Sequence, residues 1–75
     1  MTDFYQHLLA KAQARLRIAR AEHETFAANM DTSDRSAQHL TTLRLKVEEA
    51  EREVSNAERA LEGVQRMQRA IALGM

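Results

Sequence analysis

Three histidines are the first residues in this 75-residue chain that could bind a metal or transfer protons: His7, His23 and His39. Two metal ligands on one helix face need a spacing of three or four residues, and no two of these histidines have it. There is also no glycine-rich phosphate loop and no serine or cysteine beside a matched histidine. The sequence therefore predicts no metal site. His23 lies within a run of regularly spaced apolar residues. A single polar residue at such a position typically sets the register between paired helices.

A second set that could do chemistry is a run of carboxylates: Glu48, Glu49, Glu51, Glu53, Glu58 and Glu62. Carboxylates acquire catalytic pKa values in clefts, where burial and neighbouring charges shift them. A protein made of two helices has no such cleft, so we interpret the run as a solvated helix face. The sequence predicts no catalytic residue, no cofactor and no enzymatic activity.

The third set is a basic cluster formed by Lys11, Arg15, Arg17 and Arg20. Four cations over ten residues could contact the phosphates of RNA or DNA. However, the chain has 11 basic and 11 acidic residues, and no aromatic side chains are interleaved with the cluster to stack on bases. Nucleic-acid binding is therefore the least favoured hypothesis. The cluster is better interpreted as charge that solvates one helix and balances the acidic one.

The elements that position these residues are two helices, each marked by a continuous apolar stripe. The first stripe is Tyr5, Leu9, Ala12, Leu16, Ala19, His23, Phe26 and Met30. The second is Leu40, Leu43, Val47, Ala50, Val54, Ala57, Leu61, Val64, Gln68 and Ile71. Within both stripes the steps alternate between three and four residues, the spacing that coiled coils bury. The chain also has no proline and only two glycines, a composition typical of long helices.

The two stripes predict a helix over about 3–30, a turn over about 31–35 and a helix over about 36–73. We expect Asp3 to cap the first helix and Ser33 or Asp34 to cap the second. The predicted fold is all-α: one domain over residues 1–75, an antiparallel two-helix coiled-coil hairpin with a longer second helix. Dimerisation of this hairpin into a four-helix bundle is an open alternative.

The pairing of the helices can be tested by folding the sequence about residue 33. Leu16 then faces Ala50 and Ala12 faces Val54, so that small side chains meet larger ones, as interdigitating layers require. The same register places charged residues close together. Arg15 falls near Glu53, Glu22 near Lys46, and Arg20 near Arg44, the last being a mismatch of like charges.

The second helix is longer than the first by more than three turns, so its last part has no cover from its own chain. Monomers rarely expose a large apolar surface without a use. We therefore predict a surface that binds another protein or a second copy of the chain. Its residues are Phe4, Leu8, Ala60, Val64, Met67, Ile71 and Leu73.

Composition limits the classes of protein that remain. The chain has no cysteine, which excludes disulfides and thiolate metal sites. The first residues lack the pattern of a secretory signal, and no apolar run approaches the ~20 residues of a membrane span. These features predict a cytoplasmic protein with no membrane partner.

The leading hypothesis is a non-enzymatic protein–protein interaction module. An adaptor, a co-chaperone and a small inhibitor of a larger complex, including a phage-encoded one, all fit this description. The alternatives are a homodimeric structural bundle and, least favoured, a hairpin that binds RNA or DNA. In length and topology the outline resembles helical-hairpin co-chaperones of bacterial secretion systems and Rop-like hairpins that dimerise into four-helix bundles. No residue motif carries this resemblance, so it assigns no functional residue.

Overall fold

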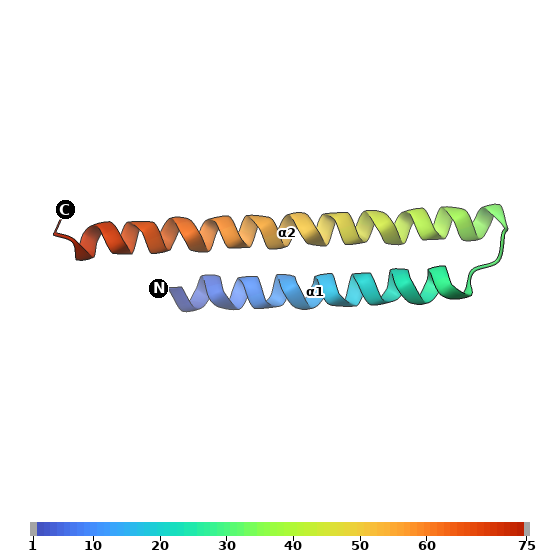
Figure 1. Cartoon of the computed structure of the whole chain (residues 1–75), viewed down its shortest axis with the longest axis horizontal. Coiled ribbons are helices and arrows are strands. Elements are labelled where there is room, and N and C mark those ends of the chain that lie inside the picture. Colours follow the sequence, from blue (N-terminus) through green and yellow to red (C-terminus); the bar gives the residue numbers. More distant parts are fainter. Residues whose placement is uncertain (1, 75) are drawn as a thin grey trace.

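A computed structural model describes residues 2–74 as two antiparallel helices, α1 (Thr2–Asn29) and α2 (Asp34–Ala72), joined by a short turn (Figure 1). The helices lie side by side in a rod of 63 × 15 × 13 Å. Helix α2 continues well beyond the first residue of α1 (Figure 1). The prediction of an all-α antiparallel hairpin with a longer second helix is confirmed.

The helix boundaries differ from the predicted ones by one or two residues. Helix α1 already includes Thr2, so the prediction that Asp3 caps it is wrong. Asp3 lies inside the first turn instead, where its negative charge is still favourable next to the free N–H groups. Helix α2 begins at Asp34, and its N-cap is Ser33, as predicted. The Ser33 hydroxyl accepts a hydrogen bond from the Ser36 N–H at 3.2 Å.

Asp31 organises the turn between the helices. One carboxylate oxygen accepts hydrogen bonds from the hydroxyls of Ser33 and Ser36, both at 2.6 Å, and from the Ser33 N–H at 3.0 Å. These donors stabilise the charged form of the carboxyl group. The Ser33 hydroxyl and then the Ser36 hydroxyl lower the pKa of Asp31 from 3.8 to about 2.

This turn is expected to give the hairpin a defined acid sensitivity. Because the pKa of Asp31 is lower in the folded chain than the ordinary 3.8, its contribution to stability is complete above that value and is lost as pH falls through about 2. NMR titration of the Asp31 carboxyl carbon should show a midpoint near 2. The double variant Ser33→Ala/Ser36→Ala should move this midpoint back towards 3.8. An unmodified chain that titrates at the ordinary value would contradict the prediction.

The core of the hairpin is narrow and rich in alanine. Among residues 3–74 its buried side chains are Ala12, Leu16, Leu43, Ala50 and Ala57, all 9% exposed or less. All five belong to the two apolar stripes, which confirms that the stripes face each other. The remaining stripe residues of the paired region are half-buried. A core of this size supplies only a few kcal/mol, so each large residue in it matters.

Ion pairs across the hairpin test the predicted register. The Arg15 guanidinium lies 3.6 Å from the Glu53 carboxylate, as predicted. Arg20 lies 3.8 Å from Glu51, an ion pair that the predicted neighbourhood of Arg20 and Arg44 did not include. Glu22 and Lys46 form no ion pair within residues 2–74. These pairs are exposed and each contributes under about 1 kcal/mol.

Gly63 lies in α2 where an added Cβ would meet no atom within 4 Å. Gly63→Ala should therefore stabilise the hairpin by about 0.5–1 kcal/mol, because alanine loses less backbone freedom on entering a helix. Urea unfolding followed by circular dichroism measures this change. Gly74→Ala is the matched control and should not stabilise, because Gly74 has a φ of 79°, in the left-handed region. Equal effects of the two substitutions would contradict the argument.

Candidate protein-binding surface

The end of α2 beyond Val64 and its C-cap residue Leu73 form a segment that we call the overhang (residues 65–73). It continues the apolar stripe without cover from α1 (Figure 1). In the paired region, stripe residue Leu43 is only 6% exposed. In the overhang, Ile71 occupies an equivalent stripe position and is 71% exposed, and the neighbouring Met67 is 66% exposed. The overhang therefore presents an apolar surface that its own chain leaves open.

Helix α1 adds two apolar side chains at the same end of the rod. Phe4 is 67% exposed, and its ring meets the Tyr5 ring edge-on with the centroids 5.3 Å apart. Leu8 is more covered, and it borders a groove together with Ala60 of α2. The first turn of α1 thus leaves Phe4 open to solvent.

The groove between the helices at this end has a volume of about 280 Å³. Its lining is Leu8, Lys11, Ala12, Arg15, Glu53, Asn56, Ala57 and Ala60. The floor consists of alanines, two of them buried, because a methyl group is too short to fill the space between the helices. The rim carries both charges, since Arg15 pairs with Glu53 there. Such a groove can receive an aliphatic or aromatic side chain from outside.

Most members of the predicted binding surface therefore gather at the open end of the hairpin, but Leu73 does not lie beside Ile71. Two residues along a helix correspond to a rotation of about 200°, which places Leu73 on a different side of α2 from Ile71. Leu73 is 76% exposed where α2 ends. Val64 is half-buried and links the paired stripe to the overhang. We use the name open-end surface for Phe4, Leu8, Ala60, Val64, Met67 and Ile71.

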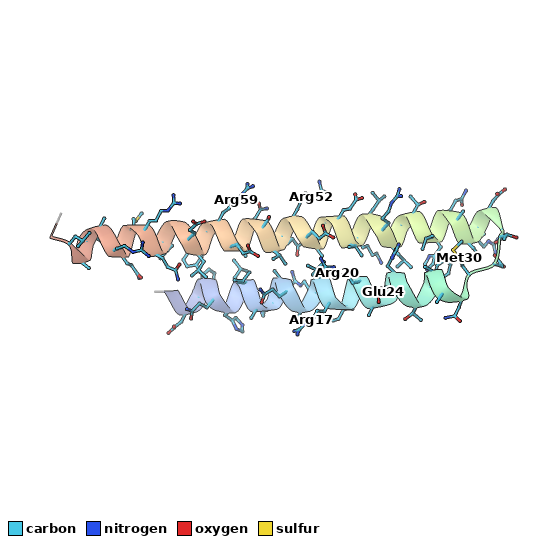
Figure 2. All side chains as sticks on the ribbon, viewed as in Figure 1. Arg17, Arg20, Glu24, Met30, Arg52 and Arg59 are labelled. Carbon is cyan, nitrogen blue, oxygen red and sulfur yellow. The ribbon has the colours of Figure 1, made fainter. Side chains whose placement is uncertain are left out.

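The predicted basic cluster is divided among different sides of the hairpin. Arg15 pairs with Glu53, and Arg20 pairs with Glu51. Arg17 points away from α2, whereas Arg20 lies between the helices (Figure 2). The four cations are not gathered on one face, which weakens the hypothesis of a phosphate-binding surface.

The histidines are also separated. His39 packs edge-on against the Phe26 ring near the turn, with the ring centroids 4.5 Å apart. Sequence reasoning missed this contact, although a histidine flanking the seam opposite an aromatic residue is a signal for it. His23 is half-buried and borders a hollow with Leu40 and Arg44. Within residues 2–74, no three histidine or carboxylate side chains are grouped so that they could hold a metal ion.

Fold and surface together define a helical hairpin with an uncovered apolar end. Comparison with protein-family models finds no matching family, and comparisons with curated proteins and with solved structures find no significant match. Within the described residues, neither helix has an apolar stretch long enough to cross a membrane.

Proposed function

We propose that the chain is a non-enzymatic protein–protein interaction module that binds another polypeptide through the open-end surface. The paired part of the hairpin acts as a rigid support, and the overhang and the first turn of α1 make the contact. The roles of adaptor, co-chaperone or small inhibitor of a larger complex are uses that this arrangement suits.

The observation that supports this proposal most is the change in exposure along one apolar stripe. Large side chains that continue a seam are expected to be buried by a partner when their own chain does not cover them. Ile71, a residue of the stripe, is 71% exposed, and Met67 beside the stripe is 66% exposed, although both follow the covered part of α2. Methionine suits such a surface because its flexible side chain adapts to irregular partners.

A photo-cross-linking amino acid placed at position 71 tests the proposal. In cells that make the protein, it should link the chain to one defined polypeptide, either another protein or a second copy. A probe at position 4, at the same end of the rod, should link to the same polypeptide. The double variant Met67→Glu/Ile71→Glu should abolish the cross-link from position 4, because it places charges in an apolar contact. Its helix content should be unchanged, since both residues are exposed.

The matched control is the same probe at position 45. Leu45 is an exposed leucine, 52% accessible, on the outer side of α2 within the paired region. We expect no defined cross-linked product there. Identical cross-linking patterns from positions 45 and 71, or loss of helix content in the double variant, would overturn the proposal.

A further inference from the structure

We infer that the polypeptide covering the open end is a second copy of this chain, packed face to face with both turns at the same end of the dimer. The inference rests on the proposed function, because it names the partner of the open-end surface. The contact is made by one long side of the hairpin, which we call the groove side. Its flanking residues are Leu8, Arg15 and Glu22 of α1 and Lys46, Glu53 and Ala60 of α2.

The groove side is hollowed along its length. One hollow of about 280 Å³ lies over Ala12 and Ala57, and a second of about 220 Å³ lies over Ala19 and Ala50. A third, of about 530 Å³, lies beside Phe26 near the turn. The first two exist because the stripe residues nearest this side are alanines. The stripe residues nearest the opposite side, such as Leu16 and Val54, are larger.

The charges of the groove side favour a copy of itself. Arg15 of α1 lies opposite Glu53 of α2 at 3.6 Å. One heptad closer to the turn the signs are reversed, with Glu22 on α1 and Lys46 on α2. A twofold axis parallel to the rod stacks α1 of each copy on α2 of the other. Each of these charges then lies over an opposite charge, so the surface is self-complementary, as a twofold interface requires.

The sizes of the side chains towards the open end agree with the same arrangement. Leu8 of one copy lies over Ala60 of the other, and Phe4 lies over Gly63. At Gly63 the space above the helix is open, because an added Cβ would meet no atom within 4 Å. Large exposed side chains of one copy therefore face small residues of the other.

The open end also determines the relative direction of the two copies. When both turns lie at one end, the two overhangs extend from the other end, diagonally across the twofold axis. Helix α1 does not reach that part, so Met67 and Ile71 of the two copies can meet across the axis. The opposite direction would place these apolar side chains beyond the polar turn that contains Asp31 and Asp34. Burial of apolar surface therefore favours the arrangement with both turns together.

The area of the groove side is close to what a stable dimer needs. The rod is 63 Å long and 15 Å wide, but two helices line the groove side only along the 28 residues of α1, about 42 Å. This part has a projected area of roughly 630 Å², and the paired overhangs add to it, which approaches the about 800 Å² that each partner contributes to a typical specific interface. Pairing of the overhangs alone, end to end, would use only about two and a half turns of helix. It would fall well below that size.

Sedimentation equilibrium over a range of micromolar concentrations tests the inference. The unmodified chain should reach twice its monomer mass of 8.6 kDa. Ile18→Glu, on the groove side, should weaken the dimer by about tenfold or more, because it adds a charge facing Glu49 of the second copy. Leu45→Glu is the matched control, since Ile18 and Leu45 are similarly exposed, at 60% and 52%. It should leave the dimer intact.

Gly63→Leu is a second test variant, and a loss of helix cannot account for its effect on the dimer. Leucine has a higher helix propensity than glycine, so α2 should be more stable. The dimer should nevertheless weaken, because the new side chain occupies the place of Phe4 from the second copy. An unchanged dimer affinity in both Ile18→Glu and Gly63→Leu would overturn the inference.

The direction of the copies is measured with a spin label on Thr32→Cys, which is unique because the chain has no cysteine. Packed helices lie about 10 Å apart, so labels on two adjacent turns should be within about 20 Å of each other. A separation near the 63 Å length of the rod would overturn the arrangement. A monomer that still cross-links to another protein from position 71 would overturn this inference alone. A monomer with no cross-link would overturn the proposed function as well.

Discussion

Leu43→Ala is expected to unfold most of the hairpin at room temperature. Leu43 is 6% exposed and is one of only two large side chains among the five buried ones. Removing a buried leucine side chain costs about 2–5 kcal/mol, which includes the cavity it leaves. A core in a chain of this size supplies about 3–5 kcal/mol in total. The substitution therefore removes a large part of the free energy of unfolding, and circular dichroism should show a steep loss of helix.

Leu45→Ala is the control for this prediction, because it removes the same atoms two residues further along α2. Leu45 is 52% exposed, so its loss should change the free energy of unfolding by less than about 0.5 kcal/mol. Both variants should be compared by urea unfolding at one protein concentration, since association would make stability depend on concentration. If the two variants lost similar amounts of stability, the burial of Leu43 would not explain its contribution to the free energy of unfolding.

The second large expected effect is a gain of stability from His23→Leu. His23 is half-buried at a stripe position of α1. A polar residue at such a position fixes the register of paired helices at a cost in stability. Replacing it with leucine buries apolar surface instead of a ring that requires solvation, so we expect a gain of about 1 kcal/mol. The midpoint of urea unfolding should rise accordingly.

The register is expected to become less well defined in the same variant. The Arg15–Glu53 distance of 3.6 Å provides a marker for it, and NOE contacts between the helices would report any shift. His7→Leu is the control, because His7 is exposed and its replacement should not stabilise the fold. If His7→Leu stabilises as much as His23→Leu, the gain comes from helix propensity and not from the seam.

Much of the fold could be predicted from the sequence because the relevant information is local and periodic. The alternation of steps of three and four residues placed Leu16 and Leu43 in the core without any knowledge of tertiary contacts. The cluster of Asp31, Ser33 and Asp34 marked the turn, because short polar side chains bond to nearby backbone. The start of α1 was placed one residue too late, since capping side chains locate a helix end only approximately.

The candidate binding surface was only partly predictable. The surplus length of α2 follows from the lengths of the two stripes, so the exposure of Ile71 was predicted correctly. The ion-pair partner of Arg20 was not predicted. Arg17 and Arg20 are three residues apart in α1, and Arg17 points away from α2 whereas Arg20 lies between the helices (Figure 2). Long flexible side chains choose partners within reach in space, and Arg20 reaches Glu51 at 3.8 Å.

The sequence by itself determined that this protein is a helical hairpin whose second helix extends past the first, because helix period, turn composition and stripe length are properties of the chain alone. The Arg15–Glu53 pair also followed from the sequence, but only the tertiary structure decided that Arg20 pairs with Glu51 and where the surface is hollowed. Those features depend on how far side chains from two helices reach into the space between them. Alanines of the two stripes, Ala12 and Ala57 among them, leave that space open on one side of the rod.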